Sequence, residues 1–431
     1  MQYAIMLGHV SMLPGFLIPW VAYAQSKAEK HDVTFALTTP SRPREAPRPA
    51  PRPTSIPNEI ALQILEAACY TDRGEPNREL LKQCALVCKD WSVLAQRLLF
   101  RDVVLRTQPA YTSFSNAVDR STPRGRMLGN AVHTLRVTLD HNQPQSLSEH
   151  AFACAVNQCP HLQQLRVAIY GQGAPGEDII GSPASERMQR AAPSFDDVTL
   201  ALLCSGPQIR NLHFSNWSDN STSLVQLLNV WPSLKSLTIT GNPPSLPSPV
   251  PEPCVCSFEE LHMTHQRSPS IDFLKWLTHH SQNSLRVLDF GREPSAEILD
   301  HLLVEHHGVL ESLSVPTCGS PKAAINGCLG LRSLRIENAD AALGLYKSLP
   351  ETIEHLAVGI HCDTPLQPVL RRVKANTLKT LTLHLWRGAE RHPQMNALRI
   401  ACAVSGVRLQ VTKDITVFRS TTNTPSPVIV A

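Results

Sequence analysis

Two spacings of apolar side chains divide the chain. From residue 58 to residue 100, apolar residues recur at helical intervals, as in Ile60 and Ile64. This spacing predicts three short helices: one from about residue 59 to the polar turn at 71–77, one over 80–87 and one over 89–99. Asn58 is predicted to cap the first helix. Three such helices cannot bury all of their apolar surface alone, so we expect a partner or the following domain to cover the remainder.

From residue 130 onward a different pattern, apolar-x-x-Leu-x-apolar, returns ten times. Seven successive steps between its central leucines measure 21 to 27 residues, which is the period of leucine-rich repeats. The central leucines are Leu135, Leu165, Leu212, Leu237, Leu261, Leu288, Leu313, Leu334, Leu356 and Leu381.

Helical spacing fills the gaps between these strands, over 223–230, 271–280, 296–306, 341–349 and 366–373. Each unit is therefore strand, loop and helix. Stacking such units predicts a curved solenoid with a parallel sheet on its concave side. The predicted fold class is α/β, with a small three-helix module followed by this solenoid.

Proline marks the predicted boundaries, since the chain has 35 Pro but only 20 Gly. A proline-arginine tract at 40–57 is predicted to be an extended linker. We expect a disordered region over 1–55, the helical module over 56–105, the solenoid over 130–412 and a tail over 413–431. Loops are expected at 171–193, with a helix over 195–204 behind it, and at 242–253.

The helical module carries a specific resemblance. Ile56-Pro57-Asn58-Glu59-Ile60, Ile64-Leu65, Leu86-Val87-Cys88-Lys89-Asp90-Trp91, Ala95 and Leu99-Phe100-Arg101 follow one another in the order and spacing of the F-box motif. The match covers about one tenth of the chain, and the loop at 70–78 is longer than is usual for the motif. Together with the repeats, it makes the chain resemble the divergent F-box/leucine-rich-repeat proteins of fungi.

This resemblance implies a non-catalytic substrate receptor of a cullin-RING (SCF-type) ubiquitin ligase. The module is expected to dock on a Skp-type adaptor while the solenoid holds a protein for ubiquitylation. Trp91 and Leu86 could instead simply hold the three helices together. The residues expected in or near the adaptor contact are Ile56, Pro57, Ile60, Ile64, Leu65, Leu86, Val87 and Trp91.

The residue after each central leucine is predicted to point to the concave surface, because side chains alternate along a strand. The candidate substrate-binding residues at this position are Arg136, Arg166, His213, His262, Asp289 and Arg335. The first half of this row is basic or carries histidine, which suits an acidic or phosphorylated partner segment. A solvated polar face with no ligand is the alternative.

The charge and the motifs favour neither an enzyme nor a nucleic-acid or membrane partner. The net charge is only +4. The GxGxxG at 171–176 lacks a following helix, and the Asp-Phe-Gly at 289–291 ends a predicted strand. Cys254 and Cys256 with His262 and His265 lack zinc-finger spacing. We therefore predict no catalytic site, cofactor or metal.

Cysteine usage favours a cytoplasmic or nuclear protein, because the 12 cysteines are widely spread and form no repeated CxxC pairing. The alternative is a secreted or cell-surface repeat protein. It rests on the uncharged residues 1–24, which end in a small-residue cleavage pattern, and on the glycosylation acceptors Asn216 and Asn220. Against it, residues 1–24 have no basic start, and prolines break their apolar stretch, which is also too short to span a membrane.

Overall fold

The computed structural model describes residues 56–70, 76–172, 190–265, 268–317, 322–338, 349–375 and 377–420. Residues Ile56–Ala431 form one compact unit. The predicted linker at 40–55, the GxGxxG beyond Gln172 and the predicted helix at 341–348 lie outside the described residues.

Three helices open the unit: α1 (Asn58–Cys69), α2 (Arg78–Cys84) and α3 (Lys89–Phe100). The prediction that Asn58 caps α1 is wrong, because Pro57 takes the capping position and Asn58 is the first helical residue. Asn77 caps α2 by accepting a hydrogen bond from the Leu80 amide at 3.2 Å. A small core joins the helices through the buried Ala61, Leu65, Cys69, Leu81, Cys84, Leu94, Ala95 and Leu98.

Within the described residues, a parallel sheet of twelve strands follows, and the strands pair in the order of the sequence. The strands are β1 (Asp102–Leu105), β2 (Thr134–Asp140), β3 (Gln164–Tyr170), β4 (Asn211–Trp217), β5 (Ser236–Gly241), β6 (Glu260–His265), β7 (Val287–Phe290), β8 (Ser312–Val315), β9 (Ser333–Ile336), β10 (His355–Ile360), β11 (Thr380–Leu385) and β12 (Arg408–Thr412). Sequential parallel pairing is the arrangement that a solenoid-like stack of repeats produces.

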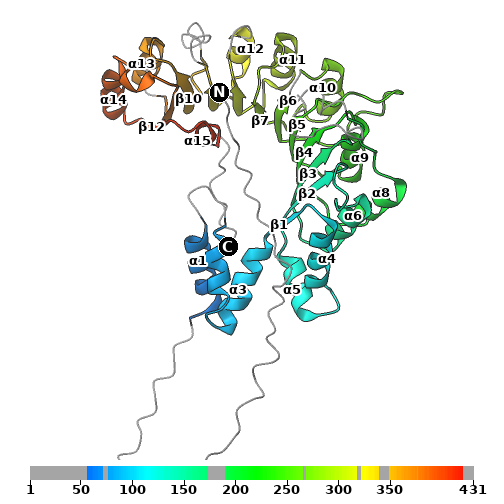
Figure 1. Ribbon diagram of the computed structural model, residues 1–431. Coiled ribbons are helices and arrows are strands. Elements are labelled where there is room, and N and C mark those ends of the chain that lie inside the picture. The colour runs from blue at the N-terminus through cyan, green and yellow to red at the C-terminus, as the bar shows by residue number, and fades with distance from the viewer. Residues whose placement is uncertain are drawn as a thin grey trace, which may run out of the picture. The chain divides into compact units, whose positions relative to one another are not determined.

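Helices connect the strands and line the outer side of the curved sheet (Figure 1). They are α4 (Gln108–Ala117), α5 (Pro123–Ala131), α6 (Glu149–Asn157), α8 (Asp197–Cys204), α9 (Thr222–Val230), α10 (Ile271–Thr278), α11 (Ala296–His306), α12 (Lys322–Gly327), α13 (Gln367–Lys374), the 3-10 turn η3 (Ala389–Arg391) and α14 (Met395–Val404). The four predicted helices at 223–230, 271–280, 296–306 and 366–373 are confirmed to within two residues at each end.

The register confirms the repeat pattern. All ten predicted leucines face one another across neighbouring strands, from Leu135 opposite Leu165 to Leu356 opposite Leu381. Their side chains are buried beneath the sheet, in the core shared with the helices. Val103 on β1 and Leu409 on β12 extend the same row at both ends, so the sheet is longer than the pattern predicts.

The end of the described chain differs from the expected tail. The short helix α15 (Ile415–Ser420) folds back against β11 and β12, and the side chain of Phe418 is fully buried there. Figure 1 shows α15 on the inner side of the sheet, opposite the connecting helices. No periodic pattern in the sequence predicts this return, because it is a single contact outside the repeats.

Candidate functional site

Apolar side chains remain exposed on the three-helix module. Ile56, Ile60 and Ile64, spaced by four residues, follow one face of α1 and its approach, and each is between 43% and 51% exposed. Leu86 and Val87, in the turn between α2 and α3, are 64% and 66% exposed. Side chains of this kind, gathered on one small module, mark a surface that can bind another protein.

The other three residues expected at the adaptor contact lie differently. Pro57 is exposed at the start of α1. Trp91 is half-buried and packs against the core of the module. Leu65 is only 1% exposed, because it faces α2 and α3 from the inner side of α1, so it supports the module from within and offers no surface to a partner.

The predicted concave residues form one continuous row. Arg136, Arg166 and His213 are neighbours across β2, β3 and β4. The row continues through Thr238 to His262, Asp289, Ser314 and Arg335. The structure therefore brings all six candidate residues into a single row, whose ends have different surroundings.

At one end the row is covered by the returning C-terminal segment; we call β7 to β12 with α15 the covered half. Arg335 is 2% exposed, pairs with Asp289 at 2.6 Å and donates to the backbone carbonyl of Arg419. The guanidinium of Arg419 donates two hydrogen bonds to the Glu337 carboxylate, from Nε at 2.6 Å and from Nη2 at 2.7 Å. Arg335 and Asp289 are thus engaged within the chain, and a partner cannot reach Arg335 while α15 is in place.

At the other end the row is accessible; we call β2 to β4 the open half. Arg136 pairs with Asp102 at 2.5 Å, and its side chain is 40% exposed. Arg166, next to it, is partly exposed and forms no ion pair with any described residue. Burial and the charge of Arg136 lower the pKa of Arg166, while burial and the nearby Arg166, His262 and Arg136 lower the pKa of His213 to about 4.

His262 lies between the two halves and has the opposite electrostatics. Burial acts to lower its pKa, but hydrogen bonds and charges from Asp289 and Glu260 outweigh burial and raise it to about 9. Its Nδ1 lies 3.3 Å from Asp289 Oδ2. His262 is therefore a cation at neutral pH, whereas His213, two strands away, is neutral.

Cys256 and His262, two members of the cysteine-histidine cluster, lie on opposite sides of the sheet. Cys256 is buried on the helix side of the sheet and donates to the carbonyls of Leu228 and Trp231, whereas His262 faces Asp289 on the concave side. Among the described residues, no group of three or more His, Cys, Asp or Glu is placed to hold a metal.

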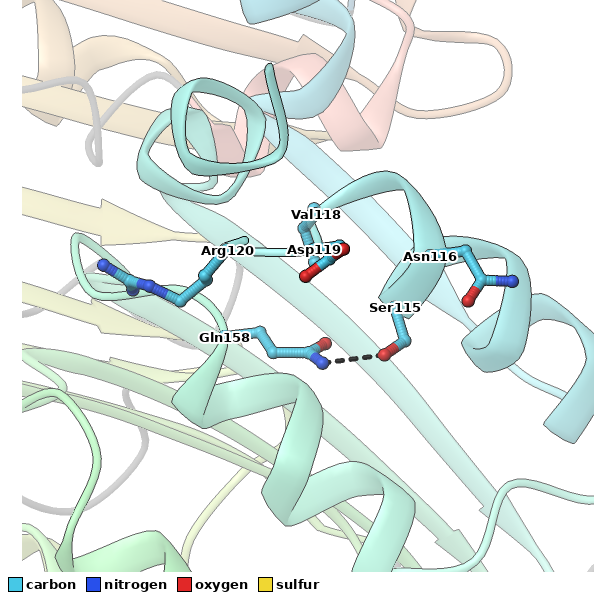
Figure 2. A pocket seen from close by; sticks show the side chains of 6 residues that line it. All are labelled: Ser115, Asn116, Val118, Asp119, Arg120 and Gln158. Carbon is cyan, nitrogen blue, oxygen red and sulfur yellow. Dashed lines mark hydrogen bonds between the residues drawn. The ribbon is translucent and has the colours of Figure 1, made fainter. Parts of the chain in front are cut away.

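One open hollow of about 420 Å³ lies between α4 and the end of α6 (Figure 2). Gln158 donates to the Ser115 hydroxyl there at 2.7 Å. The carboxylate of Asp119 accepts from the amide and the hydroxyl of Ser121, and these hydrogen bonds lower its pKa. Asp119 thus serves the turn before α5, and the residues lining this hollow provide no nucleophile with a base beside it.

The two glycosylation acceptors are structural. Asn216 is 2% exposed, donates to the Asn220 carbonyl at 2.7 Å and accepts from Ser218. Asn220 is 8% exposed and donates to the carbonyls of Ala192 and Pro193. A glycan on either amide nitrogen would break these hydrogen bonds.

Several residues on the concave side were missed by sequence reasoning. Tyr170 and Trp217 stack with ring centroids 6.4 Å apart at the ends of β3 and β4. Both stand five residues after a central leucine, so reading that position along the repeats would have found them. Glu337 and Arg419 lie 82 residues apart, and no pattern in the sequence links them.

The chain matches no protein-family model, and no curated protein is significantly similar to it. Among the described residues, no helix is both long enough and apolar enough to cross a membrane.

Proposed function

We propose that this chain is the substrate-recognition subunit of an SCF-type cullin-RING ubiquitin ligase. The module α1–α3 would be an F-box that docks on a Skp-type adaptor, and the stacked units would be leucine-rich repeats that hold a protein substrate. The chain itself carries out no bond chemistry and needs no cofactor or metal. Its place of action is the cytoplasm or nucleus, where such ligases work.

One observation carries this proposal. Five of the eight residues that the F-box resemblance assigns to the adaptor contact are large apolar side chains that the fold leaves exposed: Ile56, Ile60, Ile64, Leu86 and Val87. The helices have a closed core of their own, so these side chains are not needed to hold the module together. Exposed apolar surface of this kind is stabilised by burial against a partner, at roughly 25 cal/mol per Å².

The experiment is co-purification with a Skp-type adaptor after co-expression. The double variant Leu86→Asp, Val87→Asp should retain less than about a tenth of the adaptor, because charges would enter an apolar contact. Val304→Asp on α11 is the matched control, since Val304 is 63% exposed and far from the module in sequence, and it should retain adaptor fully. Equal retention by both variants, or no adaptor on the wild type, would contradict the proposal.

The secreted alternative is disfavoured by the burial of Asn216 and Asn220. It requires a mature chain that starts at Gln25 and carries a glycan on one of these asparagines. The intact mass of the protein made in a eukaryotic host distinguishes the two functions. We expect the mass of an unglycosylated chain, whereas the secreted alternative requires the added mass of a glycan.

A further inference from the structure

The open half of the concave face carries one arginine, Arg166, that forms no ion pair with a described residue. Asp102 neutralises Arg136, but no described acidic residue pairs with Arg166. The Nε atoms of both arginines are buried without a hydrogen-bond partner. Because the Arg166 side chain is partly exposed and forms no ion pair with a described residue, an acceptor on another molecule can pair with its guanidinium.

The surroundings of Arg166 leave room for that acceptor. On the next outward-facing position of β2, β3 and β4, toward their carboxyl ends, stand the small residues Thr138, Ala168 and Ser215. His213 beside Arg166 is neutral at pH 7, and its Nε2 lies 3.2 Å from the Ser215 hydroxyl. The Ser215 hydroxyl and the His213 imidazole on β4 are thus neutral hydrogen-bonding groups beside the Arg166 cation.

An apolar platform stands at the end of the same strands. Tyr170 lies four residues after Arg166, on the same face of β3, and is 38% exposed. Its ring stacks on Trp217 with an angle of 10° between the planes. Four residues of strand span about 13 Å, which is also the distance between side chains i and i+4 of an extended peptide.

We propose that the open half binds an extended acidic segment of a partner protein, with an Asp or Glu carboxylate on Arg166 and an apolar side chain four residues away on Tyr170 and Trp217. The arginine fork matches a carboxylate in a bidentate pair. A carboxylate fits better than a phosphate, because Asp102 and Asp140 lie on the same part of the row and would repel a second negative charge. The inference rests on the proposed function only in taking the partner to be the ubiquitylation substrate.

A random peptide display library, panned on the full chain without adaptor, tests this surface. We expect peptides with Asp or Glu and an aromatic or aliphatic residue four positions away to be enriched. Synthetic copies should lose about tenfold in affinity for Arg166→Gln, the loss of one charge-assisted pair. Arg286→Gln is the matched control, because Arg286 directly precedes β7, is exposed and pairs with Glu311. This variant should bind the peptides as the wild type does.

A second readout distinguishes a direct contact from a general charge effect. Binding of the acidic peptide should raise the pKa of His213 from about 4, measured from its ring proton shifts by NMR, because the carboxylate offsets the neighbouring cations. A copy with Gln in place of the acidic residue should leave the pKa of His213 unchanged.

Four outcomes would overturn the inference: no acidic enrichment, equal loss in both arginine variants, an unmoved pKa of His213, or binding only when the acidic residue is replaced by phosphoserine. Failure here with adaptor binding intact would leave the proposed function standing. Peptide binding without adaptor binding would overturn the proposed function and leave this surface standing.

Discussion

Arg166 and Arg335 occupy the same position of the repeat, on the same face of one sheet, yet their surroundings are opposite. Arg335 in the covered half is 2% exposed, paired with Asp289 and sealed by the returning C-terminal segment. Arg166 in the open half is partly exposed and forms no ion pair with any described residue. The repeat fixes where a side chain points, but the segments outside the repeat decide whether it stabilises the chain or remains available to a partner.

The two arginines should therefore differ most in their effect on stability. Arg335→Gln should lower the free energy of unfolding by about 3 to 5 kcal/mol, because it removes two buried charge-assisted hydrogen bonds, one to the Asp289 carboxylate and one to the Arg419 carbonyl. Arg166→Gln should change it by no more than about 0.5 kcal/mol, because no ion pair is lost. Urea unfolding curves of the two variants measure both values. Equal losses would remove the distinction between the halves.

The covered half should also depend on one aromatic side chain of α15. Phe418 is fully buried with its ring 5.4 Å from that of His384, so Phe418→Ala should cost about 3 kcal/mol. Val417, its neighbour on α15, is 43% exposed, and Val417→Ala should cost less than about 0.5 kcal/mol. Hydrogen exchange should speed up in β11 and β12 for the first variant alone. Unchanged exchange there would show that α15 does not protect the sheet.

The row should also show an opposite pH response at two of its histidines. The pKa of His262 is raised from 6.5 to about 9, so its contribution to stability is complete below pH 6.5 and is lost as the pH rises to 9. The pKa of His213 is lowered from 6.5 to about 4, so its neutral form stabilises the fold above pH 6.5 and this contribution is lost as the pH falls toward 4.

Stability measured against pH in single variants checks this sign. His262→Gln should flatten the alkaline side of the profile relative to the wild type, and His213→Gln should flatten the acidic side. His265, whose pKa burial lowers to about 4, is unchanged in both variants and cancels in the comparison. If both variants altered the same side, the electrostatic difference between the two positions would be wrong.

Periodic features were predictable from the sequence. The central leucines recur often enough to set the register of the sheet, and the register then places Arg136, Arg166, His213, His262, Asp289 and Arg335 in one row. The exposed Ile60 and Ile64 were likewise visible as one stripe of a helix.

Single contacts between distant residues could not be predicted. Leu65 follows Ile64 directly, and only the packing of α2 and α3 decides that Leu65 turns inward while Ile64 remains exposed. The return of α15 depends on the contacts of Phe418 with His384 and of Arg419 with Glu337, and neither contact recurs from repeat to repeat among the described residues. The spacing of apolar residues therefore does not predict which segment covers one half of the row.

The ion pair between Arg419 and Glu337 also bears on how the protein unfolds. In a stack whose strands pair only with their sequence neighbours, an end can fray one unit at a time. This pair joins α15, the last helix of the described residues, to the residue directly after β9, and so bridges the three strands that follow β9. Under heat or mechanical load, this end should open as one cooperative block of four strands and not as separate repeats.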